Sequence, residues 1–277
     1  MKTPFSHLNN QTGKHKDWYQ VPYLKIFCRQ INRKEQLIDQ EKFIGEYQKK
    51  YRQLELSDRL ILIAQIFDQQ VQGSYQQKLK ILSSLFAARL QTEQGMFNDG
   101  FYLFPVSKFV EIHGAQDIQT SLDFIEELTQ RFTGEWAIRT IANADEKITL
   151  KKMKVWSRHT NFHVRRLASE GLRPKLPWGK KINWVNESPE KIIPIYTRLR
   201  NDQSQYVRKS VANSMGDIIK INAELALTTF EKWLTQKVTT ENLWVIKHAI
   251  RWPVKQKHKK FLHLKKRIEV LISKNLN

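Results

Sequence analysis

The chain has 277 residues, 40% of them apolar, and is long enough to bury one large core or two smaller ones. Lys and Arg number 47 against 27 Asp and Glu, and the resulting net charge of +20 favours a polyanionic partner such as nucleic acid or an acidic membrane surface. One cysteine, Cys28, excludes an internal disulfide and a cysteine-based zinc site. No apolar run reaches the ~18 residues that span a bilayer, and residues 1–16 show no signal peptide, so we expect a cytosolic protein (bacterial cytosol or nucleoid).

The first half of the chain contains segments with helical periodicity. Apolar residues recur at i, i+3 and i+4 in residues 54–67, 76–90 and 121–132, and Ser57 is placed to cap the first of these segments. Alternation with period two, which would indicate strands, is absent over any useful length. We therefore predict an all-α protein with a polar N-terminal segment over residues 1–33 and a helical domain over residues 34–277.

Positive charge is concentrated in the second half, residues 135–277. Residues 34–135 hold 15 acids and 11 bases, whereas residues 147–181 hold 11 bases and a single acid, Glu170. Residues 247–274 hold 10 bases and one acid, Glu269. Such blocks repel themselves unless a counter-charge such as phosphate arrives. A merely solvated basic surface is the alternative, but the interleaved tryptophans favour nucleic acid over a membrane.

The same half contains an internal repeat. Val164-Arg165-Arg166 and Val207-Arg208-Lys209 match at a spacing of 43 residues, and Ile246-Lys247-His248 is a weaker copy 39 residues later. A period of 40–47 residues is typical of HEAT-type pairs of helices, which stack into a curved α-solenoid with a concave basic groove. Chance recurrence of an amphipathic motif is the alternative, and Asn161 and Asp202 before the two clear copies favour a true repeat.

Motifs for nucleotide binding, for zinc and for a Ser-His-Asp set are absent. His159 and His163 lie four residues apart without a nearby carboxylate ligand, so no metal site is expected. Glu170 stands alone among bases at the predicted end of a helix, with Gly171 as its stop and Arg166 one turn earlier. From spacing alone, Glu170 is either a plain ion-pair partner of Arg166 or a carboxylate kept for a cationic target.

Two further residues are candidates on their own pattern. Trp178 ends a segment, residues 173–178, that two prolines stiffen, so it is either presented at a fixed place or buried under the loop as a core aromatic. Glu135 begins a predicted helix, where a carboxylate can simply favour the helix dipole.

The strings HVRRLASEGLRPKLPW (163–178) and YVRKSVANSMGDIIK (206–220) resemble the AlkC branch of the HEAT-like repeat DNA glycosylases. Residues 109–142 are similar to the stretch before the first catalytic carboxylate of that family, and weaker similarity runs back to about Lys34, so the resemblance covers roughly residues 34–255. Two departures stand out: Thr140 replaces an expected proline, and Ser214-Met215-Gly216 replaces a more polar string.

The resemblance implies a glycosylase, without metal or cofactor, that hydrolyses the N-glycosidic bond of cationic N3-methylated bases, 3-methyladenine and 3-methylcytosine, in duplex DNA. It implies catalytic roles for Glu135, Glu170, Trp178 and Arg166, and no deep nucleobase pocket. The expected partner of this monomer is double-stranded DNA containing alkylated bases, with no membrane. A non-catalytic protein that binds bent, branched or damaged DNA is the alternative. The expected DNA-binding residues are Arg139, Arg165, Arg173, Lys175, Arg208, Lys209, Lys247 and Arg251.

Overall fold

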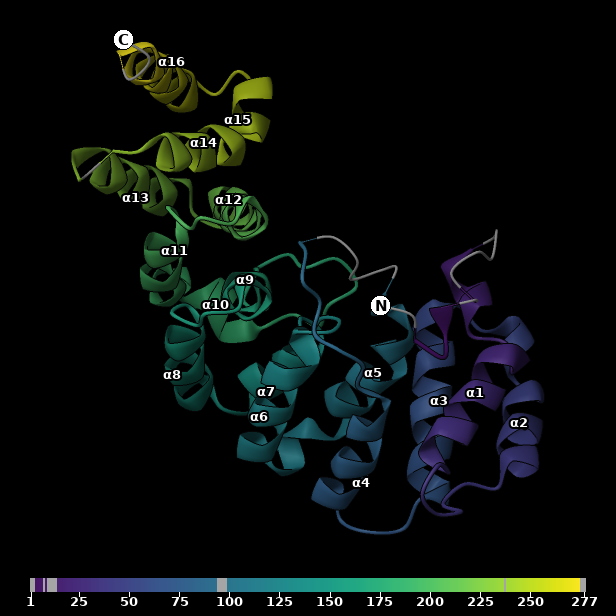
Figure 1. Ribbon diagram of the computed structural model, residues 1–277. Coiled ribbons are helices and arrows are strands. Elements are labelled where there is room, and N and C mark those ends of the chain that lie inside the picture. Colours follow the sequence, from purple (N-terminus) through teal and green to yellow (C-terminus); the bar gives the residue numbers. More distant parts are fainter. Residues whose placement is uncertain (1–2, 7, 9–13, 94–98, 237, 275–277) are drawn as a thin grey trace. The chain divides into compact units, whose positions relative to one another are not determined.

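The computed structural model describes residues 3–6, 8, 14–93, 99–236 and 238–274. Every regular element in these residues is a helix, which confirms the predicted all-α fold (Figure 1). No helix among them is long and apolar enough to cross a membrane. The chain divides into two compact units, residues 1–141 and 142–277, whereas the sequence predicted a boundary after residue 33.

The N-terminal unit is a set of packed helices with an aromatic core. Its α-helices are α1 (Val21–Ile31), α2 (Gln40–Gln48), α3 (Leu56–Gln70), α4 (Tyr75–Leu82), α5 (Phe104–His113) and α6 (Ile118–Thr129). Its 3-10 helices are η2 (His15–Trp18), η3 (Tyr51–Gln53), η4 (Ser83–Leu85), η5 (Phe101–Leu103) and η6 (Gly114–Gln116). The border between the units falls within α7 (Ala137–Ala144).

Part of the segment predicted to be polar contributes to this core. Tyr19 and Tyr23 are fully buried, and their hydroxyl groups donate to the carbonyl oxygens of Phe101 (2.5 Å) and Tyr102 (2.9 Å). The Tyr47 hydroxyl donates in turn to the carbonyl oxygen of Tyr19 at 2.6 Å. Buried phenols need such partners, so these bonds tie Tyr19 and Tyr23 to residues 101 and 102, about eighty residues later, and tie Tyr47 back to Tyr19.

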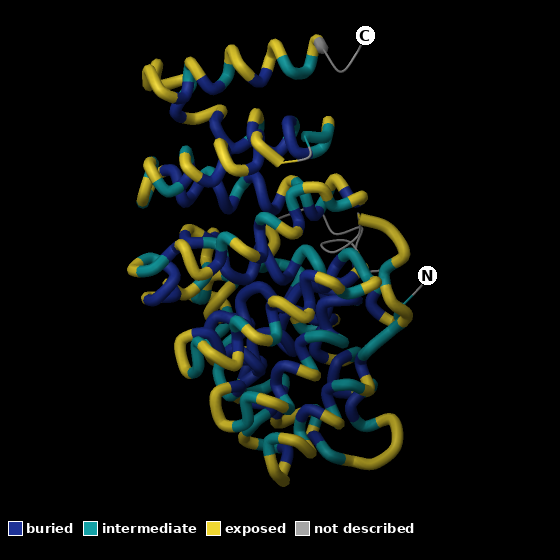
Figure 2. The backbone as a smooth tube through the Cα atoms, turned by 90° about the vertical axis from the view of Figure 1, so that its left-hand side faces the viewer, coloured by how far each residue is buried: buried dark blue, intermediate teal, exposed yellow. Residues whose placement is uncertain are grey.

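The C-terminal unit is a stack of helix pairs. Its helices are α8 (Glu146–Trp156), α9 (Phe162–Glu170), α10 (Asn183–Glu187), η7 (Pro189–Ile192), α11 (Ile193–Leu199), α12 (Gln205–Ile221), α13 (Ala223–Thr235), α14 (Thr240–Ala249), α15 (Arg251–Lys255) and α16 (Lys259–Lys274). Helix α12 packs against both α9 and α14, so the second helices of successive pairs form one layer. In Figure 1, α8, α11 and α13 follow the other edge of this unit. Figure 2 shows buried and exposed positions alternating along these helices, as amphipathic packing requires.

The two clear copies of the repeat are equivalent in structure as well as in sequence. The Arg165 guanidinium donates to the carbonyl oxygens of His159 and Thr160, six and five residues earlier (2.9 and 2.7 Å). The Arg208 guanidinium donates to the carbonyl oxygens of Asp202 and Gln203 at the same two offsets (2.6 and 2.9 Å). Both arginines therefore satisfy carbonyl groups of the turn that precedes their own helix.

Polar side chains cap the second helices of the repeat, whereas the cap predicted for residues 54–67 is absent. Asn161 caps α9, accepting from the backbone N–H groups of His163 and Val164, and Ser204 caps α12. The prediction that Ser57 caps the helix over residues 54–67 is wrong: α3 begins at Leu56, and Ser57 lies inside its first turn. Helix α3 has no side-chain cap, because Glu55 occupies the N-cap position without making that bond.

Candidate functional site: a buried carboxylate and an exposed tryptophan

Glu170 is the last residue of α9, and Gly171 follows it as the C-cap. The predicted stripe of Val164, Leu167 and Ala168 is fully buried and anchors the helix. Glu170 is itself buried, with 6% of its surface exposed. A carboxylate here faces the negative end of the helix dipole, so it needs compensating positive charge.

Two arginines supply that charge. The Oε1 atom of Glu170 lies 2.8 Å from a terminal nitrogen of Arg173 and 3.5 Å from one of Arg166. Burial raises the pKa of Glu170, but the two guanidinium groups lower it more, and the pKa of this carboxyl lies below its ordinary value of 4.5. Glu170 is therefore ionised at neutral pH although it is buried.

The structure adds a second carboxylate that the sequence did not single out. Arg173 Nε donates to Oδ2 of Asp217 on α12 at 3.0 Å, so one guanidinium joins Glu170 to Asp217. Burial raises the pKa of Asp217 above its ordinary value, with Arg173 acting in the opposite direction. The sequence held no local signal for this contact, because Asp217 lies 44 residues after Arg173.

Arg166, the predicted partner of Glu170, is held from both sides. Its guanidinium also lies over the ring of Tyr206 on α12, 5.1 Å from the ring centroid. The ring of His163 meets the same Tyr206 ring edge-on at 5.7 Å. These contacts fix Arg166 between α9 and α12, because a guanidinium over an aromatic face is attracted by the ring's quadrupole.

Trp178 stands at the top of a tight turn. The Gly179 N–H donates to the Leu176 carbonyl oxygen at 3.2 Å, so residues 176–179 form a β-turn with Pro177 at its second position. Trp178 occupies the third position with φ of 58°, where a type II turn ordinarily has glycine. Its side chain is 76% exposed, so the reading of Trp178 as a core aromatic under the loop is wrong. A large aromatic is held outward at the expense of backbone strain, which is typical of functional sites.

Glu135 belongs to the N-terminal unit, in the turn that leads into α7. It is buried, with 5% of its surface exposed, and its Oε2 atom accepts from the Thr133 hydroxyl at 3.0 Å. The Thr133 hydroxyl oxygen in turn accepts from the Glu135 backbone N–H at 3.2 Å. This carboxylate is therefore oriented by its own turn.

The residues expected to contact DNA fall into two groups. Lys175, Lys209, Lys247 and Arg251 are exposed, whereas Arg139 is 1% exposed. Arg165 forms a bidentate pair with Asp202 at 2.6 and 2.9 Å, in addition to its carbonyl contacts. Arg173 is likewise bonded to Glu170 and Asp217, and Arg208 is bonded to carbonyl oxygens of the preceding turn. These three arginines therefore stabilise the protein's own structure.

Other motifs in the sequence have structural explanations. The His159 Nδ1 atom accepts from the Asn161 N–H at 2.9 Å, and the Thr140 hydroxyl, at the expected proline, donates to the Glu111 carbonyl oxygen at 2.7 Å. Gly216 lies on α12 where an added Cβ would meet the Ala249 carbonyl oxygen at 3.4 Å, so its small size lets α12 approach α14. Cys28 is a buried free thiol whose pKa burial raises to about 12.

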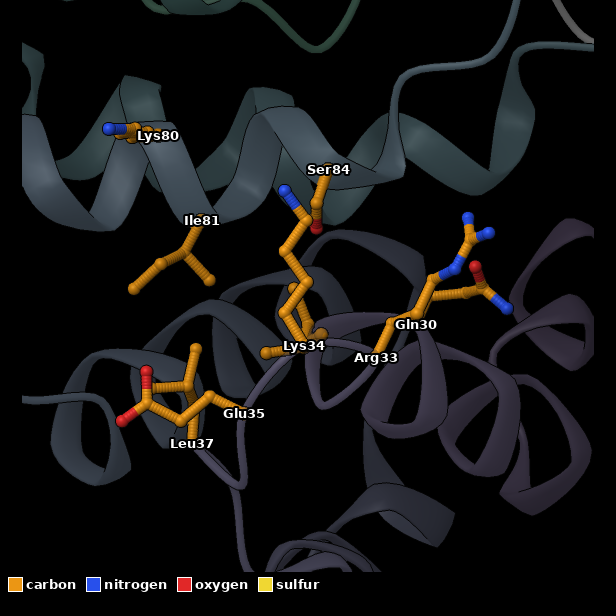
Figure 3. A pocket seen from close by; sticks show the side chains of 9 residues that line it. Gln30, Arg33, Lys34, Glu35, Leu37, Lys80, Ile81 and Ser84 are labelled. Atoms are coloured by element: carbon orange, nitrogen blue, oxygen red, sulfur yellow. The ribbon is translucent and has the colours of Figure 1, made fainter.

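Figure 3 shows a cavity of about 660 Å³ in the N-terminal unit. One side of the cavity is formed by the end of α1 and the loop that follows it, and the other side by α4. The side chains of Leu37 and Ile81 lie opposite that of Lys34. None of the predicted site residues lines this cavity.

Comparison with known proteins identifies related chains. No protein-family model matches. The "Uncharacterized protein YhaZ" of Bacillus subtilis (strain 168) is 41% identical over 162 residues, which cover 58% of this chain and 44% of YhaZ, so the match spans less than half of that relative. The structure of Pseudomonas fluorescens alkylpurine DNA glycosylase AlkC, bound to DNA containing an abasic site analog, is similar with a TM-score of 0.80 and 29% identity, over 92% of this chain and 69% of AlkC. The chain thus shares its helical fold with AlkC, which confirms the AlkC-like relationship that the sequence motifs indicate.

Proposed function

We propose that the chain is a DNA glycosylase of alkylation repair that hydrolyses the N-glycosidic bond of a cationic N3-methylated base, 3-methyladenine or 3-methylcytosine, in duplex DNA. One observation supports this most strongly: a buried, ionised Glu170 lies in the same unit as an exposed Trp178 held at positive φ. The likeness to a DNA-bound AlkC supports a glycosylase at the level of the family.

The chemistry of such a substrate suits a carboxylate without a strong acid. An N3-methylated base already carries positive charge, so it leaves with the electron pair of the C1′–N bond as a neutral base. Positive charge then develops on the sugar, and a nearby carboxylate stabilises it before water adds to C1′ and loses a proton. The leaving group needs no protonation, in contrast to the hydrolysis of O-glycosides.

The geometry favours an electrostatic role for Glu170 over that of a general base. Two guanidinium groups lower the pKa of its carboxylate, and a weakly basic carboxylate is a poor acceptor for the proton of water. The same two groups hold the carboxylate in one orientation, so no reorganisation is needed when the sugar becomes positive. We also propose a catalytic role for Glu135, whose carboxylate accepts from the Thr133 hydroxyl.

Trp178 is the proposed contact to the lesion or sugar. A cation over the face of a tryptophan gains on the order of 1–2 kcal/mol when the contact is desolvated. Lys175, Lys209, Lys247 and Arg251 are the proposed phosphate contacts, because they are exposed. We further propose that the chain is a HEAT-like repeat protein and that it acts as a monomer in the cytosol.

The test is release of base from a synthetic duplex that contains one 3-methylcytosine. Purified protein should release the free base, and a matched duplex with uracil should stay intact, since neutral uracil needs an acid to leave. Release of uracil at a comparable rate would overturn the proposed mechanism. DNA binding without release of either base would favour the non-catalytic alternative.

A further inference from the structure

A second basic surface lies in the C-terminal unit, in the layer that does not contain Glu170. A groove of about 480 Å³ runs between the C-terminal end of α8 and helix α11. Four cationic side chains line it: Lys154, Arg158, Arg198 and Arg200. Glu170, by contrast, lies on α9 in the layer of second helices.

The charges of this groove are not neutralised by the protein. Among the residues that the structure describes, no acidic side chain lines the groove, and none of its four cations forms an ion pair with a carboxylate. Other cations of this unit do have such partners, including Arg165, Lys191, Lys260 and Arg267. Four unneutralised cations around one groove repel each other until an anion binds.

Arg200 shows how the groove is built. Its guanidinium donates to the Thr197 carbonyl oxygen and to Gln236 Oε1, and it lies 5.7 Å from the ring centroid of Trp233. These neutral partners orient the group without cancelling its charge. Burial lowers the pKa of Arg200, which is the effect of placing a cation away from water without a carboxylate.

The residues that line the groove favour a nucleic acid over a protein as its partner. The described apolar residues of the groove are Pro194 and Ile195, and no aromatic side chain lines it. A protein partner binds chiefly through aromatic and aliphatic anchors in apolar pockets. Nucleic-acid backbones instead require lysine and arginine at phosphate spacing and no apolar pocket. The groove therefore fits phosphates better than an acidic peptide.

We propose that the groove between α8 and α11 binds backbone phosphates of a second nucleic-acid segment, separate from the duplex proposed to face Glu170. A protein with phosphate contacts in both layers would hold two duplexes at once. This goes beyond glycosylase activity, which needs one duplex alone.

A bridging experiment tests this inference. A duplex with an abasic-site analogue is immobilised and saturated with protein, and capture of a second, fluorescent, undamaged duplex is measured at 50 mM salt. The test variant combines Arg158→Gln with Arg198→Gln, two exposed groove residues that are not among the residues proposed for the glycosylase reaction. The control combines Lys260→Gln with Arg267→Gln, which removes the same charge from exposed positions paired with Glu224 and Glu231.

We expect wild type and control to capture the second duplex, and the test variant to capture about tenfold less, since each lost phosphate contact weakens binding strongly at low salt. Equal capture by the test variant, or no capture by a wild-type protein that is retained on the first duplex, would overturn the inference. Tighter capture of a polyglutamate peptide through the same residues would also overturn it. Failure of the protein to bind the first duplex would instead count against the proposed function, so the two failures are distinguishable.

Discussion

Two helix pairs of the C-terminal unit, α8 with α9 and α11 with α12, share a scaffold but differ at one turn. Arg165 and Arg208 make the same carbonyl contacts, and each second helix begins with a polar cap. Forty-three residues after Glu170 the chain has Asn213, in the middle of the 17-residue α12. Helix α9 stops after nine residues, so Glu170 sits at its end, next to the loop that carries Trp178. The comparison teaches that the same packing of two helices supports two different ends: a charged carboxylate and a strained turn after α9, and an uninterrupted helix in α12.

The largest effect is expected at the position where the two pairs differ. Glu170→Gln should slow base release by about 100-fold or more, because it removes the fixed charge that we propose to stabilise the developing positive charge. Affinity for DNA should stay equal or rise slightly, since a charge that repels phosphate is lost. Single-turnover release of 3-methylcytosine and a binding titration measure the two effects. Asn213→Ala is the matched control and should release base within about threefold of wild type; near-wild-type turnover in Glu170→Gln would reduce Glu170 to an ion-pair partner.

The shared arginines should differ in their effect on stability. Arg165→Ala should lower the free energy of unfolding by about 3 kcal/mol, because it leaves the buried carboxylate of Asp202 without its bidentate partner. Arg208→Ala, which loses contacts to turn carbonyls, should lower it by about 1 kcal/mol. Urea unfolding of both variants gives the comparison. Equal losses would mean that the Asp202 pair adds nothing to the scaffold.

Replacing Trp178 in the strained turn should lower activity without lowering stability. Trp178→Gly places the ordinary residue of a type II turn at φ of 58°, so thermal stability should be unchanged or slightly higher. Base release should fall about tenfold, because the aromatic face is lost. Trp178→Tyr is the control and should retain most of the activity. A clear fall in melting temperature for Trp178→Gly would show instead that the indole packs against the protein.

The smallest effect concerns the exposed cations of α12 and the segment after α14. Lys209→Gln should lower the slope of log affinity for DNA against log salt by about 0.9, which is the contribution of one phosphate contact. Arg251→Gln should act alike, although its guanidinium also donates to Asn213 at 3.1 Å. Unfolding free energies should hardly change in either variant. An unchanged slope in both would remove this face from the DNA-binding surface.

The sequence by itself determined the all-helical fold, the 43-residue repeat, the end of α9 at Gly171 and the candidates Glu170 and Trp178. These features depend on periodicity and on local stop signals, which are properties of neighbouring residues. Only the tertiary structure decided which arginines are available to a partner, because a guanidinium can reach a carboxylate that lies far along the chain. Arg165 pairs with Asp202, which lies 37 residues later, and Arg173 pairs with Asp217, which lies 44 residues later. Two cations that were expected to contact DNA are therefore held by carboxylates of the protein. The exposure of Trp178 was likewise decided by the turn's hydrogen bond and positive φ, which prolines in the sequence alone do not specify.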